Sequence, residues 1–313
     1  MRNDFQQMRQ ASSCTVAGAR SRSDALLYVK LVLTAVFWGG TFIAGRIVSR
    51  EAGPFSAAFL RFVVASVFLS LFVFKAHGRI VVPDARHIFM LCLLGLTGVF
   101  GYNFFFFSGL QTVSASRASL IVAANPAFIA LLSALIFKEK LGFVKSMGIA
   151  ISVCGAATVA IRGDLHSVFH GGIGVGELFI FGCVASWVSY SLLGKTVMKN
   201  LTPLLAVTYA CALGTLCLFI PAMSEGVARS ALHFSVSVWE GIFFLGFFGS
   251  ALAFVWYYEG ISALGPSRAG IFINLVPISS VLLAHLILSE PLDASVMVGT
   301  ILVTIGVFLA NRF

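Results

Sequence analysis

The sequence predicts an all-α integral membrane protein with ten transmembrane helices, arranged as two inverted five-helix repeats. Three observations lead to this prediction. The chain is 59% hydrophobic and only 11% charged, with a mean hydropathy of +0.98, whereas globular domains carry about 25% charged residues. Apolar runs long enough to cross a bilayer recur along the chain. Its two halves also repeat the same residues at a fixed offset.

The repeat is clearest in two proline-containing stretches, residues 116–141 and 267–292. At an offset of 151 residues, each stretch opens with Ser-Arg-Ala, has a proline near its middle and a glutamate near its end. Chance similarity between apolar runs matches Leu and Ile, but rarely Arg, Pro, Glu and Gly in one frame, so this is an internal repeat. The glycines that match in the same frame are Gly109, Gly148 and Gly155 with Gly260, Gly299 and Gly306.

A transmembrane helix needs about 20 apolar residues, and this length predicts ten spans that are bounded by Gly and Pro. The predicted spans are residues 28–47, 54–75, 86–107, 114–136, 143–161, 173–194, 202–222, 237–258, 267–288 and 293–311. Because the connections are short, we expect one packed bundle without a separate soluble domain. The expected organisation is a cytoplasmic tail at 1–27, a first repeat at 28–163 and a second repeat at 164–313.

The basic residues predict the orientation. The first 24 residues are polar, and no small-residue cleavage site follows the first apolar run, which favours a cytoplasmic tail before a retained helix. With this tail inside, fifteen Lys and Arg lie on the inner side and five on the outer side, with Arg61 inside a helix. Cytoplasmic loops are enriched in Lys and Arg, so both termini are expected in the cytoplasm of a bacterial-type inner (plasma) membrane. Five spans per half then require that the second half is inserted upside down.

The same distribution explains the formal charge of +9. The basic residues lie at the ends of apolar runs and form no stripe, so a nucleic-acid partner is not expected. The expected partners are a small-molecule solute and the lipid bilayer, and both a monomer and a homodimer remain open.

The first helix of each half contains a Trp that is followed, seven residues on, by Gly and a cation. These are Trp38 with Gly45-Arg46, and Trp187 with Gly194-Lys195. With the Trp-Gly start, Arg61 in the second span and the closing Ser-Arg-Ala stretches, the chain resembles the EamA type of the drug/metabolite transporter superfamily. The resemblance covers about residues 28–312. It implies a bundle of five plus five helices that moves amino acids, other metabolites, nucleotide-linked sugars or toxic cations.

The second half departs from this pattern at two places. It has Glu290-Pro291 where the first half has Glu139-Lys140, and it has no counterpart of Arg61. We therefore expect the two halves to contribute unequally to a binding site. Helix-end anchors or hinge pairs are the expected roles of Arg117, Arg268, Glu139 and Glu290.

Pro126 and Pro277 are predicted near the bilayer midplane of corresponding helices. Each removes a backbone donor and frees carbonyl groups, which in lipid need a neighbour, water or ligand as partner. A single such proline is often a packing kink, but two at matching positions indicate a transporter site with broken helices. Asn125 and Asn274 lie beside them, where an asparagine either joins two helices or contacts the solute.

Aromatic residues are predicted to line the same cavity. Trp38 and Trp187 lie mid-helix, not at the headgroup level, and either pack in the core or offer a ring with a polar group to the solute. The third helix of each half supplies further candidates. The predicted substrate-binding residues are Trp38, Arg61, Tyr102, Asn103, Asn125, Trp187, Tyr190, Trp256 and Asn274, with Pro126 and Pro277 as helix breaks.

Arg61 lies roughly seven residues into its helix, about 10 Å deep. Its side chain either snorkels to the headgroups or faces a water-filled cavity, where it can pair with a substrate carboxylate, since a charge facing lipid costs several kcal/mol. No Asp or Glu is predicted at mid-membrane, so a proton relay through such a residue is not expected.

The predicted function is that of a secondary-active transporter, which exports small metabolites such as amino acids by alternating access. A passive channel and a non-transporting membrane scaffold are the alternatives. An enzyme is not expected, because the sequence has no HExxH motif, no mid-membrane Asp pair and no phosphate-binding Gly-rich loop. The cysteines show no CxxC or metal-ligand spacing. We therefore expect no catalytic residues, no metal and no cofactor.

Overall fold

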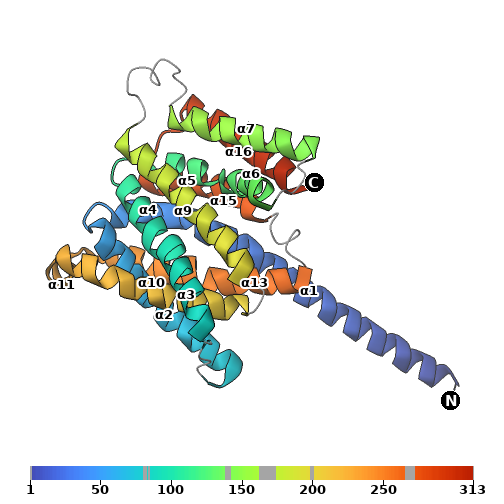
Figure 1. The fold of residues 1–313 in the computed structure, drawn as a ribbon. Coiled ribbons are helices and arrows are strands. Elements are labelled where there is room, and N and C mark those ends of the chain that lie inside the picture. The colour runs from blue at the N-terminus through green and yellow to red at the C-terminus, as the bar shows by residue number, and fades with distance from the viewer. Residues whose placement is uncertain are drawn as a thin grey trace.

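The computed structural model is a bundle of helices, with no strand among the residues that it describes (Figure 1). These are residues 2–79, 83, 85–137, 142–161, 174–197, 201–264 and 272–312, and in the first helix the side chains are described from Ala25 onward. Glu139, Arg268 and the predicted beginning of the ninth span lie outside the described residues.

The helices of the first half follow the predicted spans, with one interruption. They are α1 (Arg2–Val48), α2 (Pro54–His77), α3 (Ala85–Leu94), the π-helical segment η1 (Gly95–Gly101), α4 (Tyr102–Leu110), α5 (Ala115–Val122), α6 (Asn125–Phe137) and α7 (Phe143–Ala160). The span predicted at 114–136 is broken, because α5 ends at Val122 and α6 begins at Asn125. Pro126 therefore lies in the first turn of α6, where its missing N–H is tolerated.

The second half repeats this plan. Its elements are α9 (Val175–Val197), α10 (Pro203–Ser224), α11 (Val227–Ser230), η2 (Ala231–His233), α12 (Val236–Phe243), the π-helical segment η3 (Phe244–Leu252), α13 (Ala253–Leu264), η4 (Phe272–Asn274), α15 (Leu275–Leu288) and α16 (Ala294–Arg312). Pro277 lies in the first turn of α15, as Pro126 does in α6. The two π-helical segments also match, since Gly98 and Gly249 correspond at the repeat offset.

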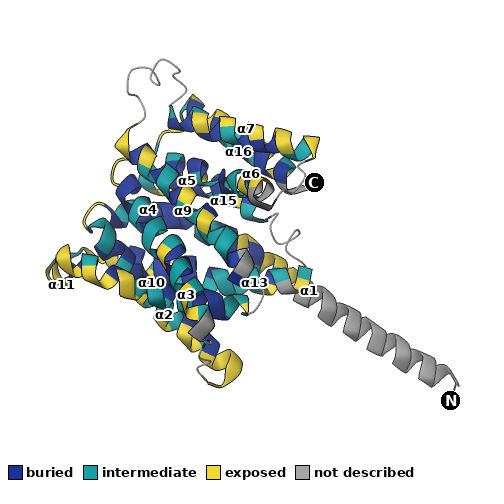
Figure 2. Cartoon of the chain, in the orientation of Figure 1, coloured by how far each residue is buried: buried dark blue, intermediate teal, exposed yellow. Residues whose placement is uncertain are grey.

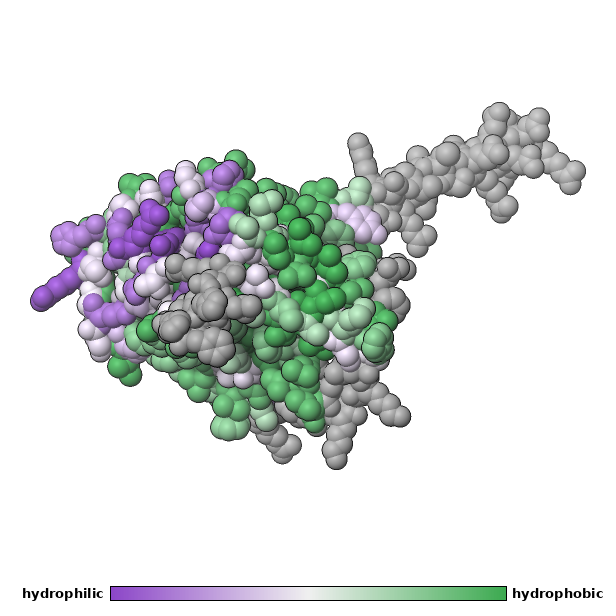
Figure 3. All heavy atoms as spheres, turned by 90° about the horizontal axis from the view of Figure 1, so that it is seen from above, coloured by the Kyte–Doolittle hydropathy of each residue, from purple (hydrophilic) through white to green (hydrophobic). Residues whose placement is uncertain are grey.

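The surface of the bundle is that of a membrane protein. In the described part of the chain, 7 helices are long and apolar enough to cross a membrane, and two shorter apolar helices follow them. Large apolar side chains point outward, with Leu71 55%, Ile220 73% and Leu286 75% exposed. Hydrophobic residues cover the middle of the face seen in Figure 3, and hydrophilic residues gather toward one end. Water does not solvate such a surface well, whereas lipid does.

Helices α7 and α16 lie side by side at the edge of the bundle (Figure 1). A Cβ atom added to Gly148 would lie 2.5 Å from the backbone nitrogen of Ala310, and one added to Gly306 would lie 2.3 Å from that of Ser152. These glycines therefore permit the close backbone contact that their spacing predicts. Both helices also contact α5 and α6, which contain the first helix break. Figure 2 shows buried residues where the helices face the bundle interior.

The first helix of each half packs on the π-helical segment of the other half. A Cβ atom added to Gly98 in η1 would lie 2.3 Å from the Tyr190 ring, and one added to Gly249 in η3 would lie 2.5 Å from Cγ2 of Thr41. Thr41 and Tyr190 each lie three residues after the tryptophan of their helix. The two helix crossings are therefore related by the internal repeat. They bring both tryptophan-bearing helices to the centre of the molecule.

Candidate functional site

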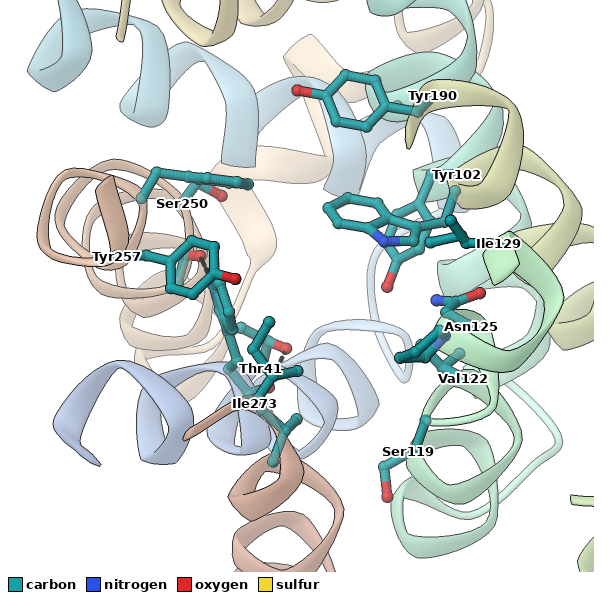
Figure 4. Close-up of a pocket in the computed structure, with 18 of the residues that line it drawn as sticks. Thr41, Tyr102, Ser119, Val122, Asn125, Ile129, Tyr190, Ser250, Tyr257 and Ile273 are labelled. Carbon is teal, nitrogen blue, oxygen red and sulfur yellow. Dashed lines mark hydrogen bonds between the residues drawn. The ribbon is translucent and has the colours of Figure 1, made fainter. Parts of the chain in front are cut away.

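A cavity of about 680 Å³ lies between the two halves and is lined by residues of both (Figure 4). This volume falls in the range of roughly 300–1,000 Å³ that is typical of small-molecule sites. Most of the lining is aromatic or aliphatic. Among the lining residues that the structure describes, Arg61 and Lys145 are the charged ones and none is acidic. The cavity is therefore an apolar chamber whose charged lining residues are two cations.

The structure brings most of the predicted site residues together around this cavity. The predicted residues that line it are Trp38, Arg61, Tyr102, Asn103, Asn125, Trp187, Tyr190 and Asn274, together with Pro126 and Pro277. Trp256 does not line it, because its ring stacks on Phe37 with the centroids 5.8 Å apart. Successive side chains on a helix diverge by about 100°. Tyr257, the next residue on α13, lines the cavity instead.

Two aromatic clusters form opposite parts of the lining. Trp38 of α1 contacts Phe254 and Tyr257 of α13, with ring centroids 5.8 and 5.2 Å apart. Trp187 of α9 contacts Tyr102 of α4, with the centroids 5.3 Å apart. Each cluster thus joins the tryptophan of one half to the third helix of the other half. Such rings present large apolar faces with a few polar groups, which suits an amphipathic solute.

Arg61 of α2 is buried in the bundle, with 7% of its surface exposed, so its side chain does not snorkel to the surface. Its Nη1 donates a hydrogen bond of 2.8 Å to Oδ1 of Asn103. Its Nε and Nη2 donate to the hydroxyl of Ser250 over 3.3 and 3.2 Å. Arg61 therefore joins the third helices of both halves through neutral oxygen atoms.

The π-helical segments orient these two acceptors. Nδ2 of Asn103 donates to the carbonyl of Val99 in η1 over 2.8 Å, which turns Oδ1 toward Arg61. The Ser250 hydroxyl donates to the carbonyl of Leu245, five residues earlier, over 2.9 Å, so its lone pairs face the guanidinium. In a π helix the bonding pattern shifts by one residue, and such segments are frequent at functional sites. Both π-helical segments therefore help to fix the position of the Arg61 side chain.

Asn125 and Asn274 lie at the two helix breaks, 6% and 9% exposed. In both residues the Oδ1 atom is buried without a hydrogen-bond partner among the described groups. The amide nitrogen of Asn125 points toward the hollow of the cavity (Figure 4). Buried amides are normally hydrogen-bonded on both sides. These side chains therefore leave hydrogen-bonding capacity that a solute or water can use.

Among the residues that the structure describes, three glutamates connect the halves at the end of the bundle where α1 ends and α2 begins, here called the latch end. Glu290 accepts hydrogen bonds from the N–H groups of Ala115 (2.8 Å) and Ser116 (3.0 Å) and from the Ser116 hydroxyl (2.6 Å). Glu225 binds the first turn of α2 in the same way, through the N–H groups of Phe55 and Ser56 and the Ser56 hydroxyl. Carboxylates are favoured there, because helix N-termini have unpaired N–H groups and a positive dipole end.

Glu51 is the third of these glutamates and accepts bonds from the N–H and the hydroxyl of Ser235, which precedes α12. These hydrogen bonds lower the pKa of the Glu51 carboxyl. Arg117 also pairs with Asp293 across the halves. Burial by itself would raise the pKa of Asp293, but hydrogen bonds from Ser295, Val296 and Arg117 together lower it. Arg117 is thus a helix-end anchor, as its position predicts.

The opposite end is joined differently. Among the described residues, the ion pair between the halves at this end is Lys30 with Glu259, at 2.7 Å, and both side chains are partly exposed. Exposed pairs of this kind contribute at most about 1 kcal/mol. Lys145 and Ala310, which lie toward this end on α7 and α16, line the cavity. The described contacts therefore hold the halves together more extensively at the latch end.

Ser250 is the main functional candidate that sequence reasoning did not identify. It follows the matched Gly249, but the corresponding position after Gly98 is Val99, so the repeat gave no reason to select it. A small polar residue beside a glycine that is repeated in both halves, within an apolar helix, is the available signal. Among the described residues, no group of three or more His, Cys, Asp or Glu could hold a metal ion.

Known proteins resemble this chain along most of its length. The uncharacterized transporter YyaM of Bacillus subtilis is 28% identical over 285 residues, which cover 91% of this chain and 93% of YyaM. A probable terminal-alkyne amino-acid exporter of Streptantibioticus cattleyicolor is 30% identical over 286 residues, which cover 90% of this chain and 92% of the exporter. A solved crystal structure, 20% identical, has the same fold with a TM-score of 0.58 over 90% of this chain and 95% of its own.

The family comparison covers both halves of the molecule. The sequence profile of the EamA-like transporter family matches residues 25–161 and again residues 174–312. These two matches together span the cavity, both aromatic clusters and both helix breaks. The chain therefore belongs to the EamA-like transporter family and is a membrane protein.

Proposed function

We propose that this protein is a secondary-active transporter that exports small metabolites, such as amino acids, by alternating access between its two halves. Each half would cross the membrane five times. The crossings of the first half would be α1, α2, α3 with α4, α5 with α6, and α7. Those of the second half would be α9, α10, α12 with α13, η4 with α15, and α16. Transporters commonly place a solute site near broken helices at the interface of such inverted repeats.

The proposed orientation has both termini in the cytoplasm of a bacterial-type inner membrane, with the latch end outside. The excess of Lys and Arg on the predicted inner side supports it, fifteen against five. Amino acids are proposed as solutes because one relative is named a probable terminal-alkyne amino-acid exporter.

The observation that carries the proposal is a cavity that both halves line, together with the contacts that join the halves at the latch end. Alternating access needs one closed and one open path, and contacts that can form and break. The Glu225 and Glu290 contacts are hydrogen bonds to helix N-termini, which water can replace. The net contribution of such a bond to stability is about 1–3 kcal/mol, small enough for a reversible gate.

The residues proposed to contact the solute are those that line the cavity. Trp38 and Trp187 would bind its apolar part, with Tyr102 and Tyr190 beside the second tryptophan. The polar contacts would come from four further lining residues. These are Arg61, Asn103, Asn125 and Asn274.

A passive channel and a membrane scaffold are the competing functions, and solute counterflow separates them from a carrier. The purified protein would be reconstituted into vesicles that are loaded with unlabelled amino acid and then diluted into labelled amino acid. A carrier accumulates the label transiently, because inner solute speeds the return of the binding site. A channel gives flux without this acceleration, and a scaffold gives none. Either of these two results, across a panel of amino acids and related metabolites, would contradict the proposal.

A further inference from the structure

The charge of Arg61 has no acidic counterpart among the described residues of the cavity. Its partners, Asn103 and Ser250, are neutral acceptors. The rings of Phe62 and Phe106 lie 5.2 and 5.9 Å from its Cζ atom. Ring faces attract a cation but do not neutralise it. A buried charge in this setting is costly until an anion joins it.

The guanidinium group of Arg61 retains free N–H donors while it is hydrogen-bonded to Asn103 and Ser250. Arginine has five N–H donors, and the bonds to Asn103 and Ser250 use three of them. One N–H on Nη1 and one on Nη2 have no partner among the described groups. A carboxylate accepts two parallel bonds from such a fork, which is the geometry that makes Arg–carboxylate pairs strong.

We infer that the cavity selects solutes that carry a carboxylate, and that Arg61 binds this carboxylate while the aromatic clusters contact the rest of the solute. This inference rests on the proposed function, since it takes the cavity as the transport site. The amide nitrogen of Asn125, which faces the hollow (Figure 4), supplies a further donor for the same anion. Solutes that are only cationic are excluded, because Arg61 and Lys145 repel them and no described lining residue is acidic.

A zwitterionic amino acid fits this description. Its carboxylate satisfies Arg61, and its ammonium group can lie against the faces of Trp38 or Trp187, where cations are attracted to the ring. The corresponding carboxamide has the same shape but lacks the negative charge, so it leaves the guanidinium uncompensated. The difference in binding affinity between the amino acid and its amide therefore tests the inference directly.

Binding to the full-length protein in nanodiscs tests the inference without transport. Trp38 and Trp187 line the cavity, so their fluorescence reports binding. The probes are matched pairs, 3-phenylpropanoate with 3-phenylpropanamide and phenylalanine with phenylalaninamide, extended to aliphatic pairs. We expect each carboxylate that binds to do so about 10–100-fold more tightly than its amide, as for hydrogen bonds to charged groups. Equal affinities, tighter binding of the amides, or no binding by any carboxylate would overturn the inference.

Variants locate the effect. R61Q should bring the carboxylate-to-amide ratio close to one, and R61K, which keeps the charge without the fork, should give an intermediate ratio. R229Q is the matched control, because Arg229 is exposed on α11 and away from the cavity, and it should keep the wild-type ratio. A wild-type ratio in a folded R61Q protein would contradict the role of Arg61. The comparison of solutes in the wild-type protein decides the solute class even if R61Q fails to fold.

The two proposals fail in different ways. Binding and counterflow of cationic solutes without carboxylates would overturn this inference and leave the transporter intact. Selective carboxylate binding without any counterflow would overturn the proposed transport function and leave the inferred selectivity of the cavity intact.

Discussion

Glu290 accepts hydrogen bonds from the backbone N–H of Ser116 over 3.0 Å and from its hydroxyl over 2.6 Å. Both residues belong to the repeated stretch, Glu290 to the second copy and Ser116 to the first. The glutamate of one copy thus caps the Ser-Arg-Ala helix start of the other. The contact joins the two halves at the start of α5, the helix that ends at the first helix break, so it can couple their relative motion to access to the cavity.

The first prediction concerns this contact. In E290Q the amide group keeps one acceptor oxygen and turns its own N–H groups toward the donors of α5, so the latch end should open more often. Ser119 lines the cavity one turn further along α5. In a background without native cysteines, S119C should therefore react about tenfold faster with an impermeant maleimide added on the latch side.

E240Q serves as the control for that labelling experiment. Glu240 is an exposed carboxylate on α12, so its neutralisation changes the charge of the chain equally without touching α5. Labelling of S119C should stay at the wild-type rate. If E290Q also labels at the wild-type rate, Glu290 does not restrict access at this end.

The second prediction concerns pH at the latch end. The hydrogen bonds from Ser235 lower the pKa of Glu51 below its ordinary value of 4.5. A carboxyl with a lowered pKa stabilises the folded contact fully above its unfolded pKa, and this stabilisation is lost as the pH falls through the folded value. Spin labels at Arg50 and Arg229, both exposed at this end, should therefore show a broader distance distribution below about pH 4.5.

The same spin-label pair in an E51Q background isolates this contribution. With glutamine at position 51, the distance distribution should be broad already at neutral pH and should change less on acidification. A wild-type protein whose distances are equal at pH 7 and at a pH well below 4.5 would show that the Glu51–Ser235 contact does not hold the halves together.

The third prediction concerns the helix crossing at Gly98. In G98A the added methyl group would lie 2.3 Å from the ring of Tyr190, so the ring or α9 must shift. Overpacking of this kind costs about 1–3 kcal/mol, and we expect a lower thermal unfolding temperature. G142A is the matched control, since a Cβ atom at Gly142 would meet nothing within 4 Å. Equal unfolding temperatures of the two variants would contradict the close packing.

The fourth prediction separates stability from binding at Arg61. N103A removes the acceptor of Nη1 and should destabilise the protein by about 1–3 kcal/mol. N103D keeps an acceptor for Nη1 and adds a negative charge beside Arg61, but it loses the donor to the Val99 carbonyl. It should therefore unfold at a higher temperature than N103A yet bind carboxylates much more weakly than the wild-type protein. Thermal unfolding and fluorescence titration check both variants. Undiminished carboxylate binding in N103D would show that the charge of Arg61 is not used for the solute.

Much of this architecture could be predicted from the sequence. Length and hydropathy indicate spans directly, and the identical offset of Pro126 and Pro277 indicates where a repeat interface would contain broken helices. The repeat also indicates the aromatic residues of the first helices, because Trp38 and Trp187 hold the same place in the two halves. Periodicity and repetition are local properties of a chain, so they are readable without a structure.

Contacts between helices far apart in sequence were not predictable in this way. Trp256 and Tyr257 are neighbours of similar chemistry, and only the rotation of α13 decides that the tyrosine lines the cavity. The acceptor role of Ser250 depends on a π-helical bond to Leu245, which no propensity indicates. The sequence indicates that Glu290 lies at a helix end, but its partner in the other half follows from tertiary packing.

The central claim is that solute crosses the membrane through the cavity between the halves. Counterflow in vesicles that contain W187A or W256A tests it most directly, because both variants lose one tryptophan and only Trp187 lines the cavity. Both proteins must elute as folded monodisperse species before reconstitution. We predict that W187A loses most of its counterflow while W256A keeps a rate close to wild type. Normal counterflow in W187A, or selective loss in W256A, would contradict the claim.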